Sequence, residues 1–185
     1  MIIYVHGFNS SANSGKAREL AAWLDARGRA AEFMCPDLPH RPAAAIALLS
    51  GLISTLPPAQ VKLIGSSLGG FYSTWLADQF DVKAALINPA VHVQDGLKNV
   101  LGPQKNYHTG EEYLFTQQHL DELAALDKPA SLRPQNLLLL VETGDEVLDY
   151  RAAVNYYAAS RQIVVPGGDH GFQSFPQYIE TILEF

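Results

Sequence analysis

Six short runs of apolar residues recur along the chain, separated by longer segments of mixed character. The runs are apolar at nearly every position, which is typical of strands that are buried on both faces. They cover residues 2–5, 31–35, 61–64, 82–88, 137–142 and 162–165. The sequence therefore predicts six buried strands.

Apolar residues recur at helical spacing in most of the intervening segments. The expected helices cover residues 17–24, 42–56, 68–80, 116–126, 150–159 and 175–183. Gly28 ends the first of them, and Pro42 opens the second, as expected from the preferences of glycine and proline at helix ends. Strands that alternate with helices imply an α/β fold, in which helices cover both faces of a parallel sheet.

Residues 91–135 interrupt this alternation. The segment is more polar than the rest, is rich in glycine and proline, and contains one expected helix. A connection of this length between two strands is usually functional or mobile. We expect residues 1–185 to form a single domain, because this length supplies a sizeable core, with residues 91–135 as a cap-like or lid-like insert.

Composition narrows the class of protein. Hydrophobic residues make up 48% of the chain and charged residues 17%, as in globular proteins. The net charge is −6 and the 13 lysines and arginines are scattered, which argues against a nucleic-acid partner. No run is long enough to span a membrane, and the first residues lack the features of a signal peptide. Cys35 is the single cysteine, so the cytoplasm is the expected location.

A Gly-x-Ser-x-Gly motif at residues 65–69 follows the third apolar run directly. The expected helix starts at once after it, so Ser67 lies at the apex of a sharp strand-to-helix turn. Gly65 and Gly69 suit such a turn, because backbone segments approach too closely there for side chains. This is the pattern of the nucleophile elbow of α/β-hydrolases, and it makes Ser67 the candidate nucleophile.

A serine nucleophile needs a base, and the base needs an acid that orients it. In α/β-hydrolases the order along the chain is serine, acid, histidine. Asp145 follows the fifth run and His170 follows the sixth. The ends of parallel strands meet at one edge of the sheet, so we expect Ser67, Asp145 and His170 to converge.

Other residues compete for the role of the acid. Asp149 is the main alternative and Glu146 a weaker one, although Asp149 also suits the N-cap of the helix that follows. Asp169 is expected to shape the turn before His170. The other histidines, at positions 40, 92, 108 and 119, lie on loops or in the insert and are not favoured as the base.

Acyl transfer also needs two donors for the developing oxyanion. The N–H groups of Leu68, which follows the nucleophile, and of Phe8, in the loop after the first strand, are the expected pair. His6 lies in the same loop and is expected to shape it or to contact the substrate.

Two rival functions find little support. Residues 10–17 resemble a phosphate-binding loop, but Ser10 replaces its first glycine and Ala17 its metal-binding hydroxyl. Histidine and cysteine spacings typical of metal sites are absent. The expectation is therefore an enzyme without a metal or another cofactor.

The chain resembles the small bacterial esterases of the YqiA type, within the α/β-hydrolase superfamily. The resemblance rests on five motifs, at residues 4–11, 65–70, 87–90, 143–150 and 167–170, which together span almost the whole chain. It implies a reduced sheet of six parallel strands. It also implies esterase or thioesterase activity, with Ser67, Asp145 and His170 as the catalytic triad.

These observations lead to the hypothesis of a cytoplasmic serine esterase that acts on a small acyl ester or thioester through an acyl-enzyme. We expect the substrate between the elbow and residues 91–135, in contact with His6, Leu114 and Phe115. The apolar residues of that segment could instead pack it onto the domain. A non-catalytic binding protein of the same fold, or a hydrolase of C–C or peptide bonds, remains an alternative. The sequence does not specify the oligomeric state.

Overall fold

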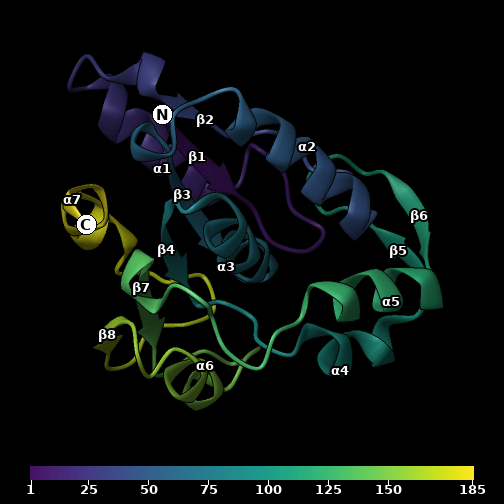
Figure 1. Ribbon diagram of the computed structural model, residues 1–185. Helices are drawn as coiled ribbons and strands as arrows, with labels where there is room; N and C mark the ends of the chain where they lie inside the picture. The colour runs from purple at the N-terminus through teal and green to yellow at the C-terminus, as the bar shows by residue number, and fades with distance from the viewer.

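Each apolar run forms a strand of one parallel sheet in the computed structural model, which describes residues 1–185 (Figure 1). The strands are β1 (Ile2–Val5), β2 (Phe33–Met34), β3 (Lys62–Ser66), β4 (Lys83–Ile87), β7 (Leu137–Glu142) and β8 (Arg161–Val165), in the order β2-β1-β3-β4-β7-β8. All neighbouring pairs are parallel. The predicted six-stranded α/β class is confirmed, and the strand ends that carry the candidate residues share one edge.

Helices cover both faces of the sheet. The helices are α1 (Gly15–Asp25), α2 (Pro42–Ser54), α3 (Leu68–Phe80), α4 (Val93–Leu97), α5 (Gln117–Leu126), α6 (Tyr150–Tyr156) and α7 (Phe175–Glu184). Apolar residues of α1 and α7 pack on one face, whereas those of α2, α3 and α6 pack on the other. Figure 1 shows α1 and α7 together on one side of the strands.

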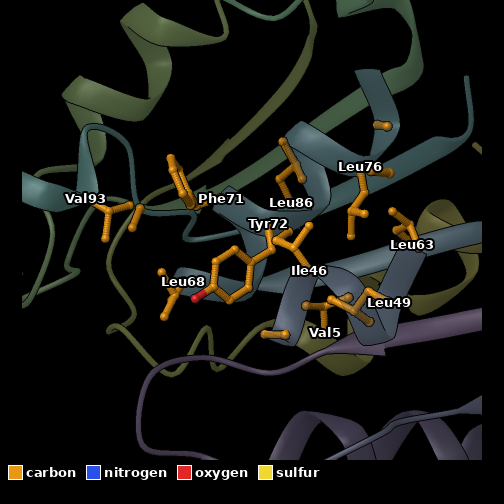
Figure 2. Packing of buried hydrophobic residues seen from close by; sticks show 14 of the residues in the cluster. Val5, Ile46, Leu49, Leu63, Leu68, Phe71, Tyr72, Leu76, Leu86 and Val93 are labelled. Carbon is orange, nitrogen blue, oxygen red and sulfur yellow. The ribbon is translucent and has the colours of Figure 1, made fainter. Parts of the chain in front are cut away.

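The larger part of the core lies under α2 and α3. Alternate residues of the strands point to this face, where Val5, Leu63 and Leu86 meet Leu49 and Leu76 (Figure 2). Complete burial of such side chains contributes about 1.5–3 kcal/mol each. This packing fixes α3 against the sheet, and with it the turn at the start of α3.

Strand β2 is shorter than the prediction of residues 31–35. Residues Ala30–Glu32 form a 3₁₀ turn, and β2 occupies the edge of the sheet. Arg29 pairs with Glu32 across this turn. Pro36, which has no N–H to donate, follows the strand closely and limits its extension.

Residues 91–135 contain more regular structure than the single predicted helix. Besides α5, they form the short helix α4 and an antiparallel hairpin of β5 (Gly102–Lys105) and β6 (Glu112–Phe115). Each hairpin strand has only four residues, and β5 is polar and contains a glycine and a proline, so the sequence pattern did not reveal them. Phe115 and Leu123 belong to the buried core, so this segment packs onto the sheet domain.

No helix has both the length and the apolar character that crossing a membrane requires.

Candidate active site

Ser67 lies at the sharp turn between β3 and α3, in a backbone conformation that non-glycine residues rarely adopt. Its φ is 55° and its ψ −121°. A Cβ atom at Gly65 would lie 2.3 Å from the carbonyl oxygen of Gly69, and one at Gly69 would lie 1.9 Å from that of Val5. Only glycine fits at either position. The tight packing thus maintains the strained turn and directs the Ser67 hydroxyl to the sheet edge.

Ser67, His170 and Asp145 form a continuous chain of hydrogen bonds. The Nε2 atom of His170 lies 3.1 Å from Oγ of Ser67. The Nδ1 atom of His170 lies 2.9 Å and 2.8 Å from the two carboxylate oxygens of Asp145. The backbone N–H groups of Val147 and Leu148 donate to Oδ1 of Asp145 and fix the carboxylate. The structure therefore brings together the three residues that the sequence placed on separate loops.

The competing carboxylates have other partners. Asp149 caps α6 and accepts a hydrogen bond from the N–H of Arg151. Glu146 accepts a hydrogen bond from the backbone N–H of His170 and does not reach its ring. Asp169 accepts a hydrogen bond from Nε2 of Gln173. Asp145 is thus the carboxylate that contacts the imidazole of His170.

The loop after β1 lies against Ser67. A Cβ atom at Gly7 would lie 3.2 Å from Cβ of Ser67. No hydrogen bond within the protein uses the N–H of Phe8 or that of Leu68, the first residue of α3. Both N–H groups are therefore free to donate to a ligand.

His6 is buried beneath this loop. Its Nε2 accepts a hydrogen bond from the N–H of Leu38, and its Nδ1 donates to the carbonyl oxygen of Gly7. Burial lowers the pKa of His6, which favours this neutral tautomer. Both ring nitrogens have partners within the protein, so His6 shapes the loop and has no ring atom free for the substrate.

A cavity of about 450 Å³ opens beside Ser67 and His170. Fifteen residues line it, and all of them come from residues 4–19, 66–67 and 169–173. Three of the fifteen are hydrophobic. Lys16 lines the cavity, and the ammonium donates to the carbonyl oxygen of Gly171, another lining residue, at 2.6 Å. The expected pocket between the elbow and residues 91–135 measures only about 40 Å³. The larger cavity thus lies on the α1 side of the site, away from the insert.

The predicted substrate contacts of the insert do not reach either cavity. Side chains alternate along β6, so Leu114 points to solvent and is 58% exposed, whereas Phe115 is buried in the core. The ring of Phe115 packs edge-on against that of Phe8, with the ring centroids 5.6 Å apart. For Phe115 the structure supports the packing alternative.

Two residues next to the site were missed by the sequence analysis. Glu142 ends β7 and is completely buried, and Asn88 follows β4 and is 2% exposed. Their side chains contact the backbone of residues 169–174. A lone carboxylate at the end of an otherwise apolar strand was the available signal for Glu142.

The model of an uncharacterised protein family, UPF0227, matches residues 1–185. The chain belongs to this family. The resemblance to YqiA-type proteins is thereby confirmed over the whole chain.

Solved structures of low sequence identity share the fold of this UPF0227 member. Mouse alpha/beta hydrolase domain-containing protein 10 is 17% identical with a TM-score of 0.71, over 99% of this chain and 88% of its own. Est1E from Butyrivibrio proteoclasticus, with ferulic acid bound, is 14% identical with a TM-score of 0.68, over 100% of this chain and 86% of its own. A monoacylglycerol lipase from Paleococcus ferrophilus is 14% identical with a TM-score of 0.70, over 99% of this chain and 93% of its own. These matches identify the α/β-hydrolase fold.

Proposed function

We propose that this protein is a serine hydrolase that cleaves carboxylic esters, or acyl thioesters, through an acyl-enzyme. The observation that carries the proposal is the unbroken chain from Ser67 Oγ through His170 to the carboxylate of Asp145. The fold alone does not define an activity. The monoacylglycerol lipase among the structures of the same fold supports the choice of an ester bond.

In the first half of the reaction, Ser67 Oγ attacks the acyl carbonyl carbon, and its proton passes to Nε2 of His170. The electron pair of the carbonyl moves to its oxygen, which accepts hydrogen bonds from the N–H groups of Phe8 and Leu68. Asp145 holds Nδ1 of His170 protonated and stabilises the imidazolium. When the tetrahedral intermediate collapses, the leaving alkoxide or thiolate takes the proton from Nε2.

The second half repeats these roles with water. His170 removes a proton from the water, whose oxygen attacks the acyl carbon and releases Ser67 and a carboxylic acid. The cavity beside Ser67 is the proposed place of the substrate. Its polar lining and the cationic Lys16 suit a substrate with polar groups next to the ester better than a long alkyl chain.

The first test is hydrolysis of p-nitrophenyl esters from acetate to palmitate, and of an acyl-CoA. Ser67→Ala and His170→Ala should each reduce kcat by about 10⁴-fold or more, and the double variant should be little worse, because the two groups act as a unit. A fluorophosphonate probe should label the wild type and Ser66→Ala, but not Ser67→Ala. Folded protein that neither reacts with the probe nor hydrolyses any ester would instead indicate a non-catalytic member of the fold.

The choice of the acid has its own test. Asp145→Asn removes the charge that favours the correct tautomer of His170, and should lower kcat by about 10³–10⁴-fold. Asp149→Asn should mainly weaken the cap of α6. A larger loss of kcat in Asp149→Asn than in Asp145→Asn would contradict the assignment.

A further inference from the structure

Glu142 is a completely buried carboxylate without a cationic partner. Its Oε2 accepts hydrogen bonds from the backbone N–H groups of Asp169 at 2.9 Å and Gln173 at 3.0 Å. Its Oε1 accepts one from the N–H of Ser174 at 2.9 Å. All of these donors belong to the segment that carries His170.

Burial of an unpaired carboxylate is costly unless hydrogen bonds replace its hydration. Burial alone would raise the pKa of Glu142, but the bonds from Ser174, Asp169 and Gln173 outweigh it and hold the pKa below its usual value. The side chain is therefore ionised at neutral pH. Hydrogen bonds to an ionised acceptor are shorter and stronger than neutral ones, so Glu142 fixes the path of residues 169–174.

Asn88 holds the same segment from the neighbouring strand. Its Nδ2 donates to the carbonyl oxygens of Asp169 at 3.0 Å and His170 at 3.2 Å. Its Oδ1 accepts a hydrogen bond from the N–H of Glu142 at 2.9 Å. Glu142 thus binds N–H groups of the segment, while Asn88 binds its carbonyl groups and also contacts Glu142.

Gly168 lets the segment approach Glu142 this closely. Its φ is +70°, and a Cβ atom there would lie 1.9 Å from Oε2 of Glu142. The preceding residue, Gly167, has a similar φ of +77°, but a Cβ atom there would meet nothing within 4 Å. An added Cβ atom would therefore contact the carboxylate at Gly168 but not at Gly167.

We propose that Glu142 and Asn88 are positioning residues that hold His170 within reach of Ser67. This inference rests on the proposed function. Neither side chain touches a reacting atom. Both act through the backbone of residues 169–170, which sets the place of the imidazole. A displacement of about 1 Å in a catalytic group can cost about 100-fold in rate.

The decisive comparison is Gly168→Ala against Gly167→Ala. Both variants carry the strain of alanine at positive φ, but only Gly168→Ala displaces the carboxylate of Glu142. We expect Gly168→Ala and Glu142→Gln to lower kcat for p-nitrophenyl butyrate by about 30-fold or more with KM changed less than about 3-fold, since the base and not the substrate is displaced. Gly167→Ala should stay within about 3-fold of the wild type, because nothing contacts its added methyl group.

Proton NMR of the His170 ring reports whether the imidazole is still hydrogen-bonded to Asp145, and it requires no substrate. The wild type and Gly167→Ala should show a slowly exchanging Nδ1–H signal from the bond to Asp145, and Gly168→Ala should lose it. Retention of the signal and of kcat in folded Gly168→Ala and Glu142→Gln would overturn the inference. If these two do not fold, Asn88→Asp decides in the same way, since it removes the amide donors and keeps the size. If the wild type hydrolyses no ester, the proposed function fails, and the NMR comparison still tests the positioning.

Discussion

Residues 169–174, which carry His170, are held from inside the molecule by the buried side chains of Glu142 and Asn88. Residues 8–10, which carry the proposed oxyanion donor Phe8, are hydrogen-bonded to the β5–β6 hairpin and to the turn between its strands. Asn9 contacts Gln104 and Tyr113 of the hairpin through its side chain. The side chain of Asn106 donates to the carbonyl oxygen of Ser10.

The two modes of attachment differ in strength and in origin. The bonds to residues 169–174 include an ionised, fully buried acceptor, whereas those to residues 8–10 join neutral groups. Bonds to charged groups contribute about 1.5–3 kcal/mol, against about 0.5–1.5 kcal/mol for neutral ones. His170, the proposed base, is thus fixed by side chains at the ends of β4 and β7. Residues 8–10 depend instead on the insert. A change in the insert should therefore affect catalysis through residues 8–10.

The largest effect on stability should follow removal of the charge at Glu142. Glu142→Gln places an amide N–H₂ against backbone donors and should lower the free energy of unfolding by about 3 kcal/mol near neutral pH. The folded-state pKa of Glu142 is depressed, so its contribution is present above the ordinary glutamate pKa of about 4.3 and is lost as pH falls through the folded-state value. Urea unfolding near neutral pH and at about pH 3 should show a deficit that shrinks in acid.

The control for this measurement is Glu180→Gln, at an exposed position of α7. Its unfolding free energy should match that of the wild type within about 0.5 kcal/mol at both pH values. A deficit in Glu142→Gln that stays constant or grows in acid would mean that the ionised carboxylate is not what stabilises the segment.

A smaller effect is expected where the hairpin meets residues 8–10. The hydroxyl of Tyr113 donates to Oδ1 of Asn9 at 2.6 Å. Burial raises the pKa of Tyr113 to about 12, so the hydroxyl stays a donor over the usual assay range. Tyr113→Phe should lower the free energy of unfolding by about 1 kcal/mol and kcat/KM for an ester by about 5-fold to 10-fold.

The comparison with Asn9→Ala sharpens this prediction. If the two groups act through their mutual bond, the double variant Tyr113→Phe with Asn9→Ala should lose less kcat/KM than the product of the single losses. Losses that simply multiply would show that the hairpin does not act on catalysis through this contact.

The smallest effect should come from Lys16, which joins α1 to residues 169–174 by its bond to the Gly171 carbonyl. Burial lowers the pKa of Lys16, so its charged form costs folding free energy at neutral pH and offsets part of the gain from the bond. Lys16→Met should therefore change the free energy of unfolding by less than about 1 kcal/mol. Arg18→Met, at an exposed position of the same helix, controls for the loss of charge, and urea unfolding of both variants gives the comparison. A loss well above that of Arg18→Met would show that the bond from Lys16 to Gly171 contributes substantially to holding residues 169–174 against α1.

Much of the fold followed from the sequence because the signal was local. Runs such as residues 137–142 are apolar at almost every position, and a strand buried on both faces needs no other information. The hairpin of β5 and β6 gave no such signal. Its strands have four residues each, and β5 is polar. The residues that the hairpin contacts, Asn9 and Ser10, are distant in the sequence.

In the candidate site, too, some features followed from the sequence and others only from the tertiary structure. The sequence alone determined which serine lies at the turn, and that Asp145 and His170 follow late strands, because parallel strands end at one edge of the sheet. Only the tertiary structure decided that the larger cavity lies beside α1, and that Glu142 and Asn88 hold the segment of His170. Asn88 and His170 are 82 residues apart. No local pattern records such a contact, because it exists only when packing brings separate strand ends together.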